Sequence, residues 1–270
     1  MGSIECSAEK EGSAGPPAGN RILVSVKSGA EYTLVRSSCP RVWVDLKDPS
    51  AGSIGLPSED VITGFLAAVQ QQSPADDRIS LALGDIEDYR RDAAAPPSAG
   101  SFAMVKLGIR RRMGLYDEPG VIGVMRRIFG PIGELPSRTL VFYADLLDDG
   151  TESSVGGRGG EGGESFERFC RFAVAGGYSR VLIDTCHKRG DSTFAYLPGG
   201  LLADRISRGS KSLPIMLAGG LTLGMLEPAI ATGAAVVGFR SAFCHGGSRR
   251  GELDREKLEW LRRRLSGTIN

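Results

Sequence analysis

Short apolar runs recur along the chain from Arg21 onward, and stretches with the helical spacing of apolar residues separate them. Each run holds four or five residues and is rich in β-branched side chains, the pattern of a buried strand in a parallel sheet. The pattern predicts eight strands, at Ile22–Val26, Arg41–Val44, Ile79–Leu83, Phe102–Val105, Leu140–Tyr143, Arg180–Ile183, Pro214–Leu217 and Ala235–Gly238.

The clearest helical stretch is Ser58–Gln71. Ser58 is a favoured helix N-cap, and Val61, Phe65 and Val69 recur at the spacing that forms one apolar face. Three further stretches have helical character by the same criteria, namely Phe166–Gly176, Leu223–Thr232 and Asp254–Leu265. The interval from Ser80 to Ser101 is interrupted by Pro96-Pro97, which cannot lie inside a long helix.

Eight strands alternating with helices over about 250 residues predict a single-domain (β/α)₈ barrel, which we place at residues 20–270. An open, doubly wound sheet is the alternative. It usually carries a glycine-rich fingerprint after its first strand, whereas here Lys27-Ser28-Gly29-Ala30 follows. Residues 1–19 are rich in Gly, Ser, Ala and Pro and show no apolar pattern, so we expect a flexible N-terminal tail.

The carboxyl ends of barrel strands carry the chemistry of such folds, and here lysine and aspartate recur at these ends. We identify seven candidate catalytic residues there: Asp45, Lys47, Asp85, Lys106, Asp145, Asp184 and Lys188. Only seven of the 33 basic residues are lysine, so lysine at three of these positions stands out in a chain that otherwise prefers arginine.

A partly desolvated lysine beside another cation can attack a carbonyl carbon or remove a proton, which arginine cannot do. Neighbouring aspartates can relay protons and orient the ammonium groups. A single such pair would be better explained by an ion pair that closes the barrel mouth. The accumulation of these two residue types at one rim favours catalysis by lysine.

The last two strands end differently and predict a phosphate site. Barrels commonly bind phosphate with the loops after strands seven and eight and a helix N-terminus. The candidate phosphate-binding residues are Gly219, Gly220, Gly238, Arg240, Ser241, Gly246 and Gly247.

Composition and charge indicate which partners, metals and cofactors to expect. A net charge of +1 argues against a general nucleic-acid or membrane-surface binder, and no apolar run is long enough to span a bilayer. With two histidines and no CxxC pair, we expect no metal site and no cofactor. The N-terminus lacks the pattern of a secretory signal, so we expect a cytoplasmic protein. Barrels of this size often self-associate, so we also expect a homo-oligomer. We interpret the glycine-rich segment Gly150–Gly163 as a disordered insertion, with a mobile flap over the site as the alternative.

The strand-end residues also carry a resemblance to a known family. They resemble (5-formylfuran-3-yl)methyl phosphate synthases, the furan-forming enzymes of methanofuran biosynthesis, from about Arg21 to Leu265. The motifs that carry it, in order, are Asp45-Leu46-Lys47-Asp48-Pro49 with Gly52-Ser53-Ile54-Gly55, Gly84-Asp85, Val105-Lys106-Leu107-Gly108, Tyr143-Ala144-Asp145, Asp184-Thr185 with Lys188 and Gly190, and Val237-Gly238-Phe239-Arg240 with Cys244 and Gly246-Gly247.

The resemblance implies a lyase that condenses two molecules of glyceraldehyde 3-phosphate into a furan aldehyde phosphate, with release of phosphate and water. The family's Schiff-base lysine falls on Lys47 and its proton-accepting lysine on Lys106. Its supporting residues fall on Asp45, Asp184 and Lys188. The N-terminal tail and Gly150–Gly163 depart from the family pattern.

Two other functions share the predicted phosphate site. One is a different Schiff-base aldolase, or a sugar-phosphate isomerase or epimerase, on the same fold. The other is a barrel that binds a phosphorylated ligand without turnover. A binding site gains nothing from lysine where arginine would hold phosphate better, so the rim lysines favour the enzymes.

Overall fold

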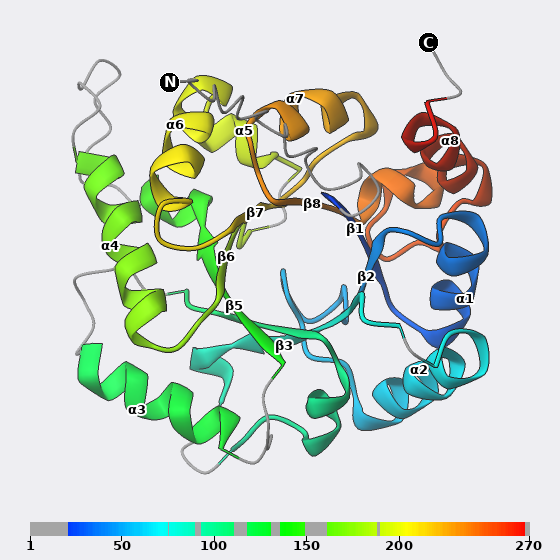
Figure 1. Cartoon of the computed structure of the whole chain (residues 1–270), viewed down its shortest axis with the longest axis horizontal. Coiled ribbons are helices and arrows are strands. Elements are labelled where there is room, and N and C mark those ends of the chain that lie inside the picture. Colours follow the sequence, from blue (N-terminus) through cyan, green and yellow to red (C-terminus); the bar gives the residue numbers. More distant parts are fainter. Residues whose placement is uncertain are drawn as a thin grey trace, which may run out of the picture.

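The computed structural model describes residues 21–74, 76–89, 93–110, 118–130, 136–148, 161–187 and 190–267. Eight parallel strands within these ranges close into a barrel in chain order, and helices surround it (Figure 1). The fold is therefore the predicted (β/α)₈ barrel. The strands are β1 (Ile22–Val26), β2 (Trp43–Leu46), β3 (Ile79–Asp85), β4 (Met104–Gly108), β5 (Ser137–Tyr143), β6 (Arg180–Asp184), β7 (Ile215–Leu217) and β8 (Val236–Phe239).

The outer layer consists of helices packed against the outward side chains of the strands. The described helices are α1 (Gly29–Ser38), α2 (Glu59–Gln72), α3 (Glu118–Phe129), α4 (Glu161–Ala175), α5 (Thr193–Tyr196), α6 (Gly199–Gly209), α7 (Leu226–Ala231) and α8 (Arg255–Leu265). The predicted tail 1–19 lies outside the described residues, as does Gly150–Gly163 up to residue 160.

Helix α1 was not predicted, although the sequence contains its start signal. The Ser28 hydroxyl accepts the backbone N–H of Glu31 at 3.3 Å, and the Glu31 carboxylate accepts the backbone N–H of Lys27 at 2.8 Å. This closely follows the reciprocal capping of a Ser-x-x-Glu box. The helix contains few apolar residues, so the apolar pattern alone did not predict it.

Two predicted boundaries shift for identifiable reasons. The predicted helix Leu223–Thr232 is a 3₁₀ turn over Leu223–Met225 followed by α7. Pro228 lacks an N–H and fits only the first turn of an α-helix, so α7 begins at Leu226. Strand β4 begins two residues and ends three residues later than predicted, at Met104 and Gly108, so Lys106 lies inside the strand.

Inside the barrel, alternation along each strand separates an apolar layer from a polar one. The inward apolar residues include Leu23, Met104, Val141, Leu182 and Met216, which form a core cluster of their own. Two residues further along several of the same strands, the inward positions become polar. The barrel interior is therefore apolar below and polar towards the carboxyl ends of the strands.

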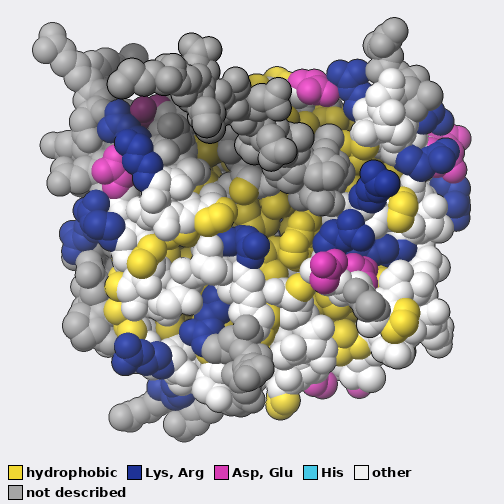
Figure 2. Space-filling model, viewed as in Figure 1, with side chains coloured by type: hydrophobic (Ala, Val, Ile, Leu, Met, Phe, Trp, Pro, Cys, Tyr) yellow, Lys and Arg dark blue, Asp and Glu magenta, His cyan; other side chains and the backbone are white. Residues whose placement is uncertain are grey.

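Within the described ranges, no helix combines the length and apolar character that crossing a membrane requires. On the face in Figure 2, basic side chains stand on several sides of a central area where apolar side chains are visible.

Candidate functional site

A buried ion pair joins β2 and β4 inside the barrel. The Lys106 ammonium contacts the Asp45 carboxylate, and both side chains are 3% exposed or less. The Asp45 carboxylate also accepts hydrogen bonds from the hydroxyls of Ser25, at 3.0 Å, and Ser80, at 2.7 Å. Since Ser25 and Ser80 pair in register with Asp45 on the two adjacent strands, three neighbouring strands hold this carboxylate. The site thus contains an amine and a carboxylate fixed at contact distance.

Lys47 follows β2 and is half-buried. Its Nζ donates to the Ser53 carbonyl at 3.2 Å. The loop can curl back this tightly because Asp48 and Gly55 form a β-bridge, and a Cβ at position 55 would lie 2.4 Å from the Asp48 carbonyl oxygen. The Gly-Ser-x-Gly motif is therefore the means by which the loop is folded over the barrel mouth.

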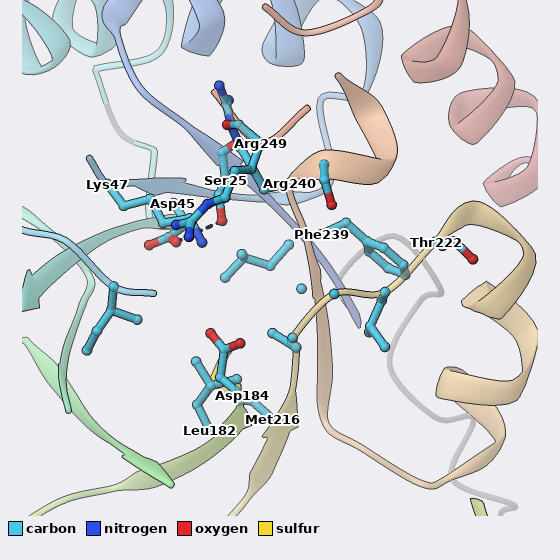
Figure 3. Close-up of a pocket in the computed structure, with 18 of the residues that line it drawn as sticks. Ser25, Asp45, Lys47, Leu182, Asp184, Met216, Thr222, Phe239, Arg240 and Arg249 are labelled. Atoms are coloured by element: carbon cyan, nitrogen blue, oxygen red, sulfur yellow. Dashed lines mark hydrogen bonds between the residues drawn. The ribbon is translucent and has the colours of Figure 1, made fainter. Parts of the chain in front are cut away.

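Asp184 ends β6 and faces Asp45 and Lys47 across the cavity (Figure 3). It is 2% exposed, and its carboxylate accepts the Ser53 hydroxyl at 2.7 Å and the backbone N–H of Thr185 at 2.7 Å. Ser53 therefore connects the loop that holds Lys47 to the carboxylate on the opposite wall.

The carboxyl ends of the strands enclose a cavity of about 330 Å³. Lys47, Lys106, Asp45 and Asp184 lie on its walls, as the strand-end positions predicted. A volume of this size accommodates small metabolites. Lys188 lies outside the described residues, so its predicted place at the site stays a prediction.

The predicted phosphate residues divide between this cavity and the molecular surface. Gly219, Gly220, Gly238, Ser241 and Gly247 line the cavity, whereas Gly246 is exposed and does not. Gly219 and Gly220 both have positive φ, and a Cβ on either would lie within 2.5 Å of atoms in residues 191–193. These two positions therefore require glycine, which leaves a wall of bare backbone at the ends of β7 and β8.

Arg240 lines the cavity, but its guanidinium is fully engaged within the protein. It forms a buried ion pair with Glu31 and donates to the carbonyls of Ser25, Arg249 and Gly251 at 2.8–3.0 Å. These contacts use all five N–H donors of the side chain. The prediction that Arg240 binds phosphate directly is not supported by this geometry, and Arg240 instead holds the segment after β8 in place.

Asp85 and Asp145 stand at strand ends as predicted but do not line the cavity. The Asp85 carboxylate accepts the Tyr143 hydroxyl at 2.5 Å, and burial raises the pKa of Asp85 to about 6 despite this bond and the nearby positive charge of Arg110. Asp145 accepts the backbone N–H groups of Cys186 and His187 at 2.7 and 2.6 Å. Asp145 therefore orients the loop after β6 rather than facing the cavity.

Sequence reasoning missed three hydroxyl side chains and one cation at the site. Ser25, Ser53 and Ser80 bond the two central carboxylates, and Arg249 lines the cavity from the segment after β8. Ser25 and Ser80 are polar residues inside apolar runs, a signal that the strand pattern contained. Among the described residues, no group of three or more His, Cys, Asp or Glu side chains could hold a metal ion.

Solved structures of other barrels share the fold. Phosphoribosyl anthranilate isomerase from Thermus thermophilus superimposes with a TM-score of 0.53 at 12% identity, covering 92% of this chain and 100% of the isomerase. Thiamine phosphate pyrophosphorylase from Pyrococcus furiosus gives a TM-score of 0.52 at 12% identity, covering 92% of this chain and 96% of that protein. At these identities the likeness concerns the fold alone.

Relatives in sequence identify the family of the chain. The (5-formylfuran-3-yl)methyl phosphate synthase of Methanobrevibacter smithii is 26% identical over 232 residues, covering 84% of this chain and 86% of the relative. The enzyme of the same name from Methanothermobacter thermautotrophicus is 27% identical over 230 residues, covering 82% of this chain and 89% of the relative. The sequence model of the 4-HFC-P synthase family matches residues 22–262, almost the whole barrel. The chain therefore belongs to the 4-HFC-P synthase family.

Proposed function

We propose that this protein is a lyase that joins two molecules of glyceraldehyde 3-phosphate into (5-formylfuran-3-yl)methyl phosphate, with Lys47 forming a Schiff base to the first triose. Two triose phosphates contain the atoms of this product plus one phosphate and two waters, so the reaction needs no oxidant or reductant. The single observation that carries the proposal is the meeting of Lys47, Asp184 and the Lys106–Asp45 pair in one cavity. Membership of the family, and relatives named for this activity, support it.

The first steps follow from amine chemistry. The Lys47 amine attacks the aldehyde carbon of one triose, and water leaves to give an iminium ion. The positive nitrogen acidifies the C2–H bond, so a base can take that proton while its electron pair forms an enamine. The enamine electrons then expel phosphate from C3, which leaves an unsaturated iminium.

The buried pair is suited to move the C2 proton. Lys106 and Asp45 are in contact, so a proton taken by one can be shared with the other. The hydroxyls of Ser25 and Ser80 fix the carboxylate throughout. We assign Asp184 the proton transfers at oxygen atoms when the second triose adds, the ring closes and water departs, and its position on the opposite wall supports this role. Hydrolysis of the iminium finally frees Lys47 and the aldehyde.

The glycine wall of β7 and β8 supports a phosphate contact. Gly219, Gly220 and Gly238 present backbone without side chains to the cavity, which permits close approach of a phosphate group. We assign one of the two substrate phosphates to this wall.

The test combines product detection with covalent trapping. Purified protein with glyceraldehyde 3-phosphate alone is expected to produce the strong ultraviolet absorbance of a furan aldehyde. Borohydride added during the reaction is expected to leave a stable mass increase on the peptide containing Lys47. Lys47→Arg, which keeps the charge, is expected to lose turnover and trapping, whereas Lys211→Arg on the exposed surface serves as the matched control.

Two outcomes contradict the proposal. Trapping at another lysine with Lys47 unmodified would exclude the assigned nucleophile. Turnover of a triose phosphate to a product without furan absorbance would favour an aldolase or isomerase instead.

A further inference from the structure

Arg249 and Arg240 come from the same segment after β8 but have different surroundings. The Arg240 guanidinium donates hydrogen bonds to the Glu31 carboxylate and to backbone carbonyls, one of which belongs to Arg249 itself. The side chain of Arg249 lines the cavity, and one Nη donates to the carbonyl of Gly52. Arg240, which is buried, therefore fixes the backbone from which the Arg249 side chain extends to the cavity.

Within the described residues, Arg249 forms no ion pair, and its remaining N–H groups have no hydrogen-bond acceptor. This contrasts with Lys106 and Arg240, whose charges are balanced by contact with Asp45 and Glu31. Asp184 and Asp48 act on Arg249 only at longer range, and burial lowers its pKa from the ordinary value. An arginine remains charged despite such a shift, so a partly desolvated cation with open donors faces the cavity.

Its location is the mouth of the site. Arg249 borders the inner cavity and also an outer depression, whose lining includes Ser50, Gly52 and Arg250. The bond to Gly52 places it beside the same loop whose next carbonyl, that of Ser53, holds Lys47. In Figure 3, Arg249 lies on the side of the cavity that carries Lys47 and Arg240, and Asp184 lies across from it. The Arg249 side chain therefore lies at the mouth of the cavity, beside the loop that holds Lys47.

We propose that Arg249 binds the phosphate monoester of one of the two substrate molecules, while the glycine wall of β7 and β8 binds the other. This inference rests on the proposed function, because a reaction between two triose phosphates brings two dianionic groups into one cavity. The guanidinium fork matches phosphate oxygens and supplies several charge-assisted hydrogen bonds at once. Arg249 thus selects a phosphorylated partner over an unphosphorylated aldehyde.

The first test uses the wild-type protein and phenylglyoxal, a reagent that modifies arginine. The probe is glycerol 3-phosphate, a phosphate monoester that has no aldehyde and cannot form a Schiff base. Peptide mass spectrometry is expected to show that it slows the modification of Arg249 and leaves the exposed Arg263, in the last turn of α8, unaffected, while glycerol protects neither. Equal modification of Arg249 with and without the probe would overturn the proposal.

The second test separates a direct contact from shielding by a ligand bound elsewhere. Calorimetric titration with glycerol 3-phosphate is expected to show at least about tenfold weaker binding in Arg249→Gln, since a charge-assisted hydrogen bond is lost. Arg263→Gln is the matched control and is expected to bind as the wild type does, and Arg249→Lys is expected to fall between the two. Unchanged affinity in Arg249→Gln, or an equal loss in Arg263→Gln, would refute a specific role.

Both readouts are independent of turnover. If the wild type makes no furan aldehyde, the proposed reaction fails, while protection of Arg249 still reports whether it binds phosphate. If furan forms and Arg249→Gln binds normally, only the present inference fails.

Discussion

Replacing Lys106 with methionine removes one partner of the buried ion pair and leaves an unbranched apolar side chain that is one atom shorter. The Asp45 carboxylate would remain about 1% exposed, with hydrogen bonds from Ser25 and Ser80 but no cation in contact. Removing one partner of a buried pair costs about 3–5 kcal/mol, because the other charge stays buried without compensation. We expect Lys106→Met to lose this much free energy of unfolding at pH 7.

A thermal melt is the direct assay of this loss. For a protein of this size, about 1 kcal/mol moves the melting temperature by roughly 2–4 °C, so the expected decrease is on the order of 6–20 °C. Denaturant titration at 25 °C gives the free energy itself, and circular dichroism confirms that the variant folds.

The double variant Asp45→Asn/Lys106→Met is the decisive control. Removing both charges leaves no unpaired ion, so the double variant is expected to be more stable than the sum of the two single changes predicts, by about 2–3 kcal/mol. The pair does not stabilise the fold in this way if the losses of unfolding free energy in the two single variants simply add in the double variant. The same holds if Lys106→Met costs less than about 1 kcal/mol.

Three further predictions concern residues around the barrel mouth. Because burial raises the pKa of Asp85 to about 6, ionising it costs the folded state free energy. The stability of the wild type is expected to fall by about 2 kcal/mol relative to Asp85→Asn as the pH rises from 4 to 7, measured by denaturant titration at each pH. A Cβ at Gly108 would lie 1.9 Å from the Asp85 carboxylate, so Gly108→Ala is expected to lower the unfolding free energy by about 1–3 kcal/mol, whereas Gly123→Ala, on an open helix face, should raise it slightly. Ser28→Ala is expected to cost about 1 kcal/mol through loss of the α1 cap, and Ser58→Ala, whose side chain makes no capping bond, should cost clearly less in the same unfolding assay; equal costs would contradict the capping argument.

The alternation of apolar runs and helical stretches was sufficient to predict the barrel and the rim on which its chemistry lies. Strand periodicity is a local property, and the closure of eight parallel strands places all their carboxyl ends at one opening. For this reason Asp45, Lys47, Lys106 and Asp184 could be assigned to one site from the sequence.

Tertiary structure alone decided which strand-end residues face the cavity and which support it. Asp85 and Asp145 share the sequence context of Asp184, but their partners are Tyr143 and the backbone of residues 186–187, which are distant in sequence.

The two arginines after β8 show the same limit. Arg240 and Arg249 are equally basic in sequence, and only the position of Glu31, more than 200 residues away along the chain, makes one a structural ion pair. A side chain's role depends on the charges and hydrogen-bond acceptors that folding brings to it, and local sequence does not encode which acceptors those are.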